Sequence, residues 1–509
     1  MKYLNSVFLL FVLSIVNAQS PAIQWQKCFG GSNSETGNSI KITSDGGYIL
    51  AGSSNSVNGD VTQNFGGVDY WIVKMNSVGT IQWQKSYGGS GDDYANSVQQ
   101  TSDGGYIVAG TSKSNNGHIS NSHGNNDFWI IKLDSTGNLI WQKSLGGTSN
   151  DSAQSVQQTT DGGYIVAGSS SSNNGDVSAN HGYSDFWIVK LNSTGNIIWE
   201  KSLGGSGEDV AMSVRQTSEG GYIIAGYTNS SNGNVTQNFG GSDYWVIKLN
   251  SLGNLEWEKS IGNLFDDISY SAEQTMDGGY IVAGATTLNS ESGVPDYRVL
   301  KLNSAGGIEW SRYFGGNAHD NGQEVRQTPD GGYIVGGWTV SNNGDVTGNH
   351  GIQDFWLVKL NSQGSLVWQK TLGGIDVDAF SSLEVTPDNG YIVAGYTMSN
   401  SGDVSGNHGA MDAWVVKLNP EQLGVSESIH TNQILMYPNP AKNFFYLDHL
   451  PADVLVDFTD ISGRKVFSEY FNTEKIKINT SEFTNGTYIV SVKKKDGTFV
   501  FSEKLIISK

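Results

Sequence analysis

Seven acidic residues recur at one position of a repeated segment, and their spacing could gather them around a bound cation. Each stands ten residues after a tryptophan, at intervals of 58 residues with one interval of 53. Carboxylates held close together repel one another, and a cation such as Ca²⁺ relieves that repulsion. In the alternative interpretation, each carboxylate holds its own loop by accepting backbone N–H groups, or pairs with a lysine at the seam between repeats. The seven residues are Glu35, Asp93, Asp151, Asp209, Asp267, Asp320 and Asp378.

A column of lysines keeps the same spacing. It lies in segments such as DFWIVKLN, and we expect it at the same end of the fold as the acidic column, where the two could pair. Its members are Lys74, Lys132, Lys190, Lys248, Lys301, Lys359 and Lys417.

A third column carries flat rings six residues before the second tryptophan of a repeat. Because phenylalanine cannot ligate a metal, the two phenylalanines exclude a metal site built on the whole column. The rings either pack their loop or form stacking platforms for sugars, with Asn and Asp of segments such as 173–176 bonding to hydroxyl groups. The column consists of Phe65, His123, His181, Phe239, His350 and His408.

Sequence motifs for catalysis are absent. The chain has no HExxH, no CxxC and no phosphate-binding P-loop, and its Gly-Gly pairs sit in hairpin turns. Paired carboxylates such as Asp92-Asp93 are neighbours on loops, and one sequence cannot show which carboxyl groups face each other. We therefore expect no catalytic residues and no cofactor, with Ca²⁺ as the exception that the acidic column would require.

The elements that position these columns form a repeat of four strands. DGGYIVAG or a close variant occurs seven times, and it joins a tight Asp-Gly-Gly turn to a β-branched strand. A strand such as SVQQT precedes it, so the unit is a β-hairpin. The DFWIVK segment and a strand such as IQWQKS complete the four, with tryptophans at 25, 83, 141, 199, 257, 310 and 368.

Four strands repeated seven times predict an all-β fold, a seven-bladed β-propeller. The chain begins with a tryptophan strand at 23–28 and the repeats end with a DFWIVK-type strand at 412–418, so the first strand can complete the last blade and close the ring. Long loops such as 172–185 share one face of the propeller, which we take as the candidate binding face because loops carry function. The fifth repeat differs: its long loop, within 286–296, is five residues shorter, and Arg298 replaces a tryptophan.

The segment KLNSTGNIIW at 190–199 resembles the tryptophan-docking repeat of quinoprotein-like propellers. That resemblance covers about ten residues per blade. It implies that each tryptophan stacks between adjacent blades, and it says little about a cofactor.

The start of the chain predicts export, and its net charge limits the partners. Residues 1–18 read as a secretory signal peptide, with Lys2 before an apolar core at 7–16. This ten-residue core is too short to span a bilayer, and no later segment approaches 18 apolar residues. The net charge of −19 argues against nucleic acid and against anionic membrane surfaces, and leaves cations, neutral glycans or basic proteins as partners.

The composition changes after residue 419. We interpret 420–433 as a linker and 434–509 as a small β-sandwich. This tail resembles the type A C-terminal sorting domain of the Bacteroidetes type IX secretion system. The matching residues are Tyr437, Pro438, Asn439, Pro440, Gly463, Gly486, Tyr488 and Lys504, within YPNP, DISGRKV, NGTY and KLII. The resemblance implies export by the type IX machinery to the cell surface or the medium.

The sequence thus predicts a signal peptide (1–18), a seven-bladed propeller (19–419), a linker (420–433) and a sorting domain (434–509). As its function we expect a secreted or surface-exposed binding or adhesion module for a glycan or protein ligand. Two alternatives are an enzyme, either a glycan-active hydrolase or lyase or a quinone-dependent oxidoreductase, and a structural surface-layer component. The near-identity of the blades favours the first interpretation, because a catalytic site needs asymmetry.

Overall fold

A computed structural model describes residues 19–288, 293–421, 434–460, 463–495 and 499–509. The chain divides into two compact units between residues 423 and 424. The predicted signal peptide, most of the predicted linker and part of the shortened loop of the fifth repeat lie outside the described residues.

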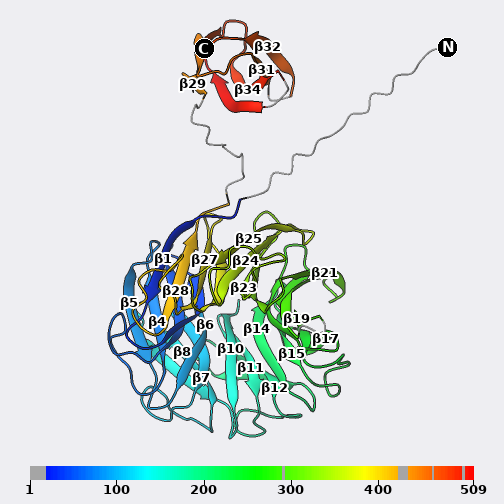
Figure 1. The fold of residues 1–509 in the computed structure, drawn as a ribbon. Coiled ribbons are helices and arrows are strands. Elements are labelled where there is room, and N and C mark those ends of the chain that lie inside the picture. The colour runs from blue at the N-terminus through cyan, green and yellow to red at the C-terminus, as the bar shows by residue number, and fades with distance from the viewer. Residues whose placement is uncertain (1–18, 289–292, 422–433, 461–462, 496–498) are drawn as a thin grey trace, which may run out of the picture. The chain divides into compact units, whose positions relative to one another are not determined.

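The first unit is the predicted propeller: seven four-stranded antiparallel sheets surround a central axis (Figure 1). The strands next to the axis are β2 (Glu35–Ile42), β6 (Asp93–Gln100), β10 (Asp151–Gln158), β14 (Asp209–Gln216), β18 (Asp267–Gln274), β22 (Asp320–Gln327) and β26 (Asp378–Val385). The second strands are β3 (Tyr48–Ser54), β7 (Tyr106–Ser112), β11 (Tyr164–Ser170), β15 (Tyr222–Thr228), β19 (Tyr280–Thr287), β23 (Tyr333–Thr339) and β27 (Tyr391–Thr397).

The outer half of each blade consists of a buried strand and a tryptophan strand. The third strands are β4 (Asp69–Met75), β8 (Asp127–Leu133), β12 (Asp185–Leu191), β16 (Asp243–Leu249), β20 (Pro295–Leu302), β24 (Asp354–Leu360) and β28 (Asp412–Leu418). The outermost strands are β5 (Ile81–Tyr87), β9 (Leu139–Leu145), β13 (Ile197–Leu203), β17 (Leu255–Ile261), β21 (Ile308–Phe314), β25 (Leu366–Leu372) and, in the seventh blade, β1 (Ile23–Phe29).

The ring closes as predicted. Strand β1 pairs antiparallel with β28, with Lys27 opposite Val415, and completes the sheet β1-β28-β27-β26. In Figure 1 the blue N-terminal strand lies beside the yellow-orange β28. Strand β2 of the first blade also contacts β26 and β27 of the last. The seventh blade therefore has its fourth strand, and the edge of β28 is paired at the point where the repeats begin and end.

The Asp-Gly-Gly turns explain why the repeated motif needs its first glycine. Gly104 has a φ of 82°, in the left-handed region where a side chain is strained. In the seventh blade asparagine takes this place, and Asn389 has a φ of 63°. Asparagine tolerates this conformation better than most residues, so the turn is kept in every blade despite the substitution.

The core lies between blades. All seven residues of β8 are buried, which confirms that the DFWIVK-type segments are covered on both faces. Each tryptophan of an outer strand also reaches a neighbouring blade: a Cβ atom at Gly79 would lie 2.9 Å from the ring of Trp25, and one at Gly137 would lie 2.8 Å from Trp83. Six of the seven tryptophans thus occupy space that a glycine leaves in a turn of the next blade, and the seventh, Trp368, packs against Tyr391 of the next blade. The resemblance to quinoprotein-like propellers beyond this packing stays a prediction.

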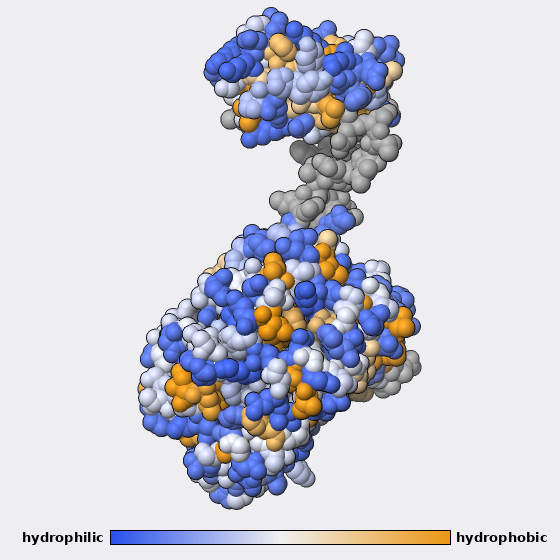
Figure 2. Space-filling model, turned by 90° about the vertical axis from the view of Figure 1, so that its left-hand side faces the viewer, coloured by the Kyte–Doolittle hydropathy of each residue, from blue (hydrophilic) through white to orange (hydrophobic). Residues whose placement is uncertain are grey.

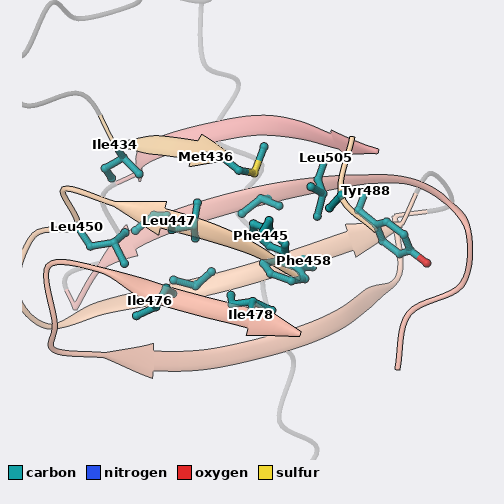
Figure 3. Close-up of a cluster of buried hydrophobic side chains, with 14 of the residues drawn as sticks. Ile434, Met436, Phe445, Leu447, Leu450, Phe458, Ile476, Ile478, Tyr488 and Leu505 are labelled. Carbon is teal, nitrogen blue, oxygen red and sulfur yellow. The ribbon is translucent and has the colours of Figure 1, made fainter. Parts of the chain in front are cut away.

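The second unit is a small β-sandwich of two sheets. One sheet contains β29 (Leu435–Tyr437), β30 (Phe444–Asp448) and β33 (Ile476–Asn479). The other contains β32 (Lys465–Phe471), β31 (Val454–Asp460), β34 (Gly486–Lys494) and β35 (Phe499–Ile507), in that order. Figure 3 shows Phe445, Leu447, Phe458 and Leu505 converging between the strands as a buried core.

The tail residues singled out in the sequence tie the sandwich together. The side chain of Asn439 donates to the carbonyl of Lys504 (2.6 Å) and accepts from the N–H of Ile506 (2.9 Å). Tyr437 donates to Asp448 (2.7 Å), and the buried Tyr488 donates to the carbonyl of Thr484 (2.9 Å). Asn439 thus joins the first segment of the unit to its last strand, whereas Tyr437 bonds to β30 and Tyr488 to a residue four positions before it.

The outer surface is mainly hydrophilic in the view of Figure 2, where hydrophobic residues form separate small patches. Among the residues that the structure describes, we find no helix with the length and apolar character needed to span a bilayer.

Candidate functional site

A pocket of about 530 Å³ opens on the propeller axis. It is built from the residue one before the end of each innermost strand, so every blade contributes one side chain. In the second blade this residue is Gln99, which pairs with Ile107 next to the Asp-Gly-Gly turn. The pocket therefore lies at the short-turn end of the axis. The seven residues in chain order are Lys41, Gln99, Gln157, Arg215, Glu273, Arg326 and Glu384.

Four consecutive blades form an arc of ion pairs in this pocket, comprising Glu273, Arg326, Glu384 and Lys41 together with the buried Glu324. Lys41 bonds to Glu384, and Arg326 bonds to Glu324 and lies 3.2 Å from Glu384. Although burial alone would raise it, the charges of Lys41 and Arg326 lower the pKa of Glu384 to about 2. The same two cations lower the pKa of Glu324 against the effect of burial. These carboxyl groups are therefore held ionised.

The other three blades form a donor arc of Gln99, Gln157 and Arg215. The side-chain oxygen of Gln99 accepts the backbone N–H of Gln158, and that of Gln157 accepts the N–H of Gln216, both at 2.6 Å. Because an N–H group can bond only to the oxygen of a carboxamide, each Nε2 group is left to face the pocket. Within the described part of the chain, neither Nε2 group has a hydrogen-bond acceptor.

The sequence contains a signal for this pocket that our sequence analysis missed. Within repeats that are otherwise nearly identical, the third residue of segments such as SVQQT, SVRQT and SAEQT changes from amide to cation to anion. We expected the binding face on the long loops, whereas the pocket lies at the opposite end of the axis.

The acidic column lies under the long loops, with each carboxylate bonded inside its own blade. Asp93 accepts from the N–H of Gly89 (2.8 Å) and from the hydroxyls of Ser112 and Ser114. Asp151, Asp209, Asp320 and Asp378 repeat this pattern, and Glu35 bonds to Gly31 and Ser54. All seven side chains are fully buried. The described residues contain no group of three or more His, Cys, Asp or Glu arranged to hold a metal ion.

The lysine column does not pair with these carboxylates, so that alternative was wrong. Lys132 lies 2.9 Å from Asp103 of the Asp-Gly-Gly turn and donates to the carbonyl of Leu133. The other lysines pair with the equivalent turn residues, Asp45, Asp161, Glu219, Asp277, Asp330 and Asp388. Lysine follows the starting aspartate of its strand by five residues, which carries it to the far end of the blade, beyond reach of the acidic column.

A second acidic column, also missed in the sequence, begins the third strands. It comprises Asp69, Asp127, Asp185, Asp243, Asp296, Asp354 and Asp412, and in each of them Oδ1 is buried without a hydrogen-bond partner among the described residues. Each faces an acidic residue of the next blade across a glycine. A Cβ atom at Gly204, for example, would lie 2.6 Å from Oδ1 of Asp185 and 2.4 Å from Oδ2 of Asp209. The available signal was the aspartate that stands five residues before the lysine of every repeat.

The ring column sits on the long loops above this second acidic column. The backbone N–H of each member donates to the aspartate four residues later, as from His350 to Asp354 at 2.8 Å. The side chains of His181, His350 and His408 also approach these carboxylates through Nδ1, and they are 41%, 39% and 46% exposed. Phe65 packs edge-on against His118, and the ring of Phe239 is exposed. The rings of His123, His181, His350, His408 and Phe239 remain accessible, and their sugar-stacking role stays a prediction.

Arg298 fills the place of the missing tryptophan in the fifth blade. Its guanidinium group bonds to Asp267 (3.1 Å) and lies over the rings of Tyr244 and Tyr313. The side chain is buried. The replacement of tryptophan by arginine in this blade therefore produces an internal ion pair with Asp267.

Comparison with known proteins supports the assignment of the tail. Residues 435–508 match the family model described as secretion system C-terminal sorting domain. The chain therefore carries a sorting domain of the type IX secretion system and is a secreted or cell-surface β-propeller protein.

Other likenesses are more distant. The regulatory protein FlaEY of Caulobacter vibrioides is 26% identical over 342 residues, which are 58% of this chain and 35% of that protein. The chain thus spans about a third of the length of this relative. Among solved structures, PorZ of Porphyromonas gingivalis, a surface component of the type IX secretion system, has a TM-score of 0.38 at 12% identity, with 92% of this chain and 58% of that chain covered. A fungal alcohol oxidase in complex with copper has a TM-score of 0.42 at 10% identity, with 96% and 100% covered.

Proposed function

We propose that the propeller is a non-catalytic binding module, delivered to the cell surface or the medium by its sorting domain, and that its ligand enters the axial pocket. The observation that carries this proposal is the loss of symmetry in the pocket. Blades of nearly identical sequence would present seven equal side chains to the axis, but here they present two amides, three cations and two anions. A ligand without sevenfold symmetry needs such an uneven wall.

The charge state of the pocket favours binding over catalysis. A glycosidase needs one carboxylic acid whose pKa is raised so that it can donate a proton near neutral pH. In this pocket Glu324 and Glu384 have lowered pKa values because Arg326 and Lys41 stabilise their ionised forms. These two side chains therefore contribute fixed negative charge at the pocket and are poorly suited to donate a proton.

An array experiment tests the proposal. The full chain is applied to immobilised glycans and basic peptides, beside two variants of equal added bulk. Gln157→Trp fills the pocket, whereas Ile140→Trp adds the same ring at an exposed position of the outer strand β9. We expect binding by the parent and by Ile140→Trp and loss of binding by Gln157→Trp. The melting temperature of Gln157→Trp should be slightly lower, because this variant loses the hydrogen bond to the N–H of Gln216.

Two results would contradict the proposal in different ways. Absence of any bound ligand would remove the binding function. Binding that survives Gln157→Trp would move the site away from the axis, and the exposed rings of His181, His350 and His408 would then be the next surface to mutate.

A further inference from the structure

The donor arc is unusual because it holds hydrogen-bond donors without acceptors. The oxygens of Gln99 and Gln157 are used by backbone N–H groups, which leaves two N–H donors on each Nε2. The adjacent Arg215 adds a guanidinium group, which only donates. These three side chains thus offer the pocket hydrogen-bond donors that no described residue uses.

Arg215 is also the cation of the pocket with the weakest compensation. The carboxylate oxygen nearest to its guanidinium group, on Glu324, is 3.7 Å away, beyond hydrogen-bonding distance. The guanidinium group makes no hydrogen bond with another described residue. Glu324 is already bonded to Arg326 and to the N–H of Leu383. Burial, and then the charge of Arg326, lower the pKa of Arg215. Glu324, Glu384 and Glu273 act on this pKa in the opposite sense, but none of them bonds to the guanidinium group. The group stays charged, as arginine does in proteins, without a directly bonded carboxylate.

The ion-pair arc differs in this respect. Lys41 and Arg326 each bond directly to a glutamate, so their charges are neutralised inside the protein. Oε2 of Glu273 accepts no hydrogen bond from a described residue and lies 3.7 Å from Arg326, while Oε1 of Glu273 accepts the N–H of Gln327 (3.0 Å). A molecule in the pocket would meet these donors and, on the blade that follows Arg215, a carboxylate acceptor.

We propose that the axial pocket binds a small polar molecule through an oxyanion, a carboxylate or a sulfate, held by Arg215, Gln157 and Gln99, while a hydroxyl group of the molecule donates to Glu273. This assignment rests on the proposed binding function and specifies its ligand class. Arginine suits the role because its planar fork matches the two oxygens of such a group. A pocket of about 530 Å³ has the size of a small-molecule site and accommodates an acidic monosaccharide.

The test measures the affinity of the full chain for three matched probes, glucuronate, glucose 6-sulfate and glucose, by titration calorimetry at low salt. We expect one or both anions to bind at least about tenfold more tightly than glucose, because a hydrogen bond to a charged group contributes more than a neutral one. The two anionic probes distinguish a carboxylate from a sulfate. Added salt should weaken anion binding because the interaction is between charges.

The repeat supplies the variant and its control. Arg215→Gln places at this position the residue that the second and third blades already carry, so the blade is expected to fold. Lys41→Gln makes the same change of charge in the same pocket, but at a cation that Glu384 already neutralises. Arg215→Gln should weaken anion binding about tenfold or more, and Lys41→Gln by less than about threefold.

The inference fails if glucose binds as well as the anions, if Arg215→Gln leaves anion affinity unchanged, or if none of the three probes binds. Its failure is distinguishable from failure of the proposed function. Array ligands that are lost in Gln157→Trp but retained in Arg215→Gln would leave a binding propeller whose pocket does not select an oxyanion.

Discussion

Asp69 and Asp93 belong to successive blades, and a carboxylate oxygen of each lies against Gly88. A Cβ atom at this glycine would be 1.8 Å from Oδ1 of Asp69 and 2.7 Å from Oδ2 of Asp93. Burial, reinforced by the charge of Asp93, raises the pKa of Asp69 to about 6. Every junction between blades repeats this arrangement. Arg298 bonds to Asp267 at the junction of the fourth and fifth blades, so the other six pairs have no arginine or lysine partner among the described residues.

These pairs predict an acidic optimum of stability. Asp69, Asp243, Asp296 and Asp378 have pKa values of about 6 in the folded chain. A raised pKa contributes stability that is present below the unfolded value, about 3.9, and is lost as the pH rises through about 6. The turn carboxylates beside the lysines act in the opposite sense: the pKa of Asp103 is about 2, so its stability is present above about 3.9 and is lost as the pH falls towards 2.

The melting temperature should therefore be highest near pH 4 to 5 and fall between about pH 5 and 7. Asp69→Asn removes one member of a pair while keeping an oxygen that can accept the N–H of Phe65, so the fall on the alkaline side should become shallower. A melting temperature that rises steadily from pH 4 to 7 in the parent would contradict the prediction.

Asp209 should stabilise its own loop whether or not calcium is present. Its carboxylate bonds to the N–H of Gly205 and to the hydroxyls of Thr228 and Ser230. We expect Asp209→Ala to lower the free energy of unfolding by roughly 1–3 kcal/mol, as for other hydrogen bonds to charged groups. Urea unfolding with calcium and with chelator measures the loss.

Asp376→Ala is the control for this experiment, since Asp376 is exposed and its carboxylate makes no hydrogen bond with a described residue. Equal losses for Asp209→Ala with calcium and with chelator are expected. A calcium-dependent rise in melting temperature that disappears in Asp209→Ala would instead support the cation site predicted from the acidic column.

The closing strand should be essential to the propeller. Deletion of residues 20–31 removes β1, the outermost strand of the seventh blade, and exposes the edge of the buried strand β28. We expect aggregation or a large fall in melting temperature. Deletion of residues 434–509 is the matched comparison, because it removes a separate unit and should leave the propeller transition unchanged. A propeller that melts normally without β1 would show that closure is dispensable.

The same tail deletion should block export. The truncated chain lacks the sorting domain, so we expect it to accumulate in the periplasm as a folded propeller. Cell fractionation with antibodies to the propeller measures this. Normal appearance of the truncated chain at the cell surface would mean that the tail does not direct secretion.

The sequence by itself determined the architecture. Strand period, Asp-Gly-Gly turns and the interval of 58 residues are local properties repeated seven times, so they predict four strands per blade and seven blades without knowledge of tertiary contacts. The closure by β1 was predicted from the types of strand at the two ends of the repeat region. The motifs of the tail identified the sorting domain.

Only the tertiary structure decided which of the repeated residues contact one another. A bulge between Ala95 and Ser97, repeated in each innermost strand, shifts the alternation of side chains by one residue, so a strict period of two cannot show that Gln99 faces the axis. Likewise, Lys132 pairs with Asp103 because strand length places both at the short-turn end, away from Asp93. The pocket arises where seven strands converge, and the distances between residues about 58 positions apart are set by closure of the ring rather than by any local pattern.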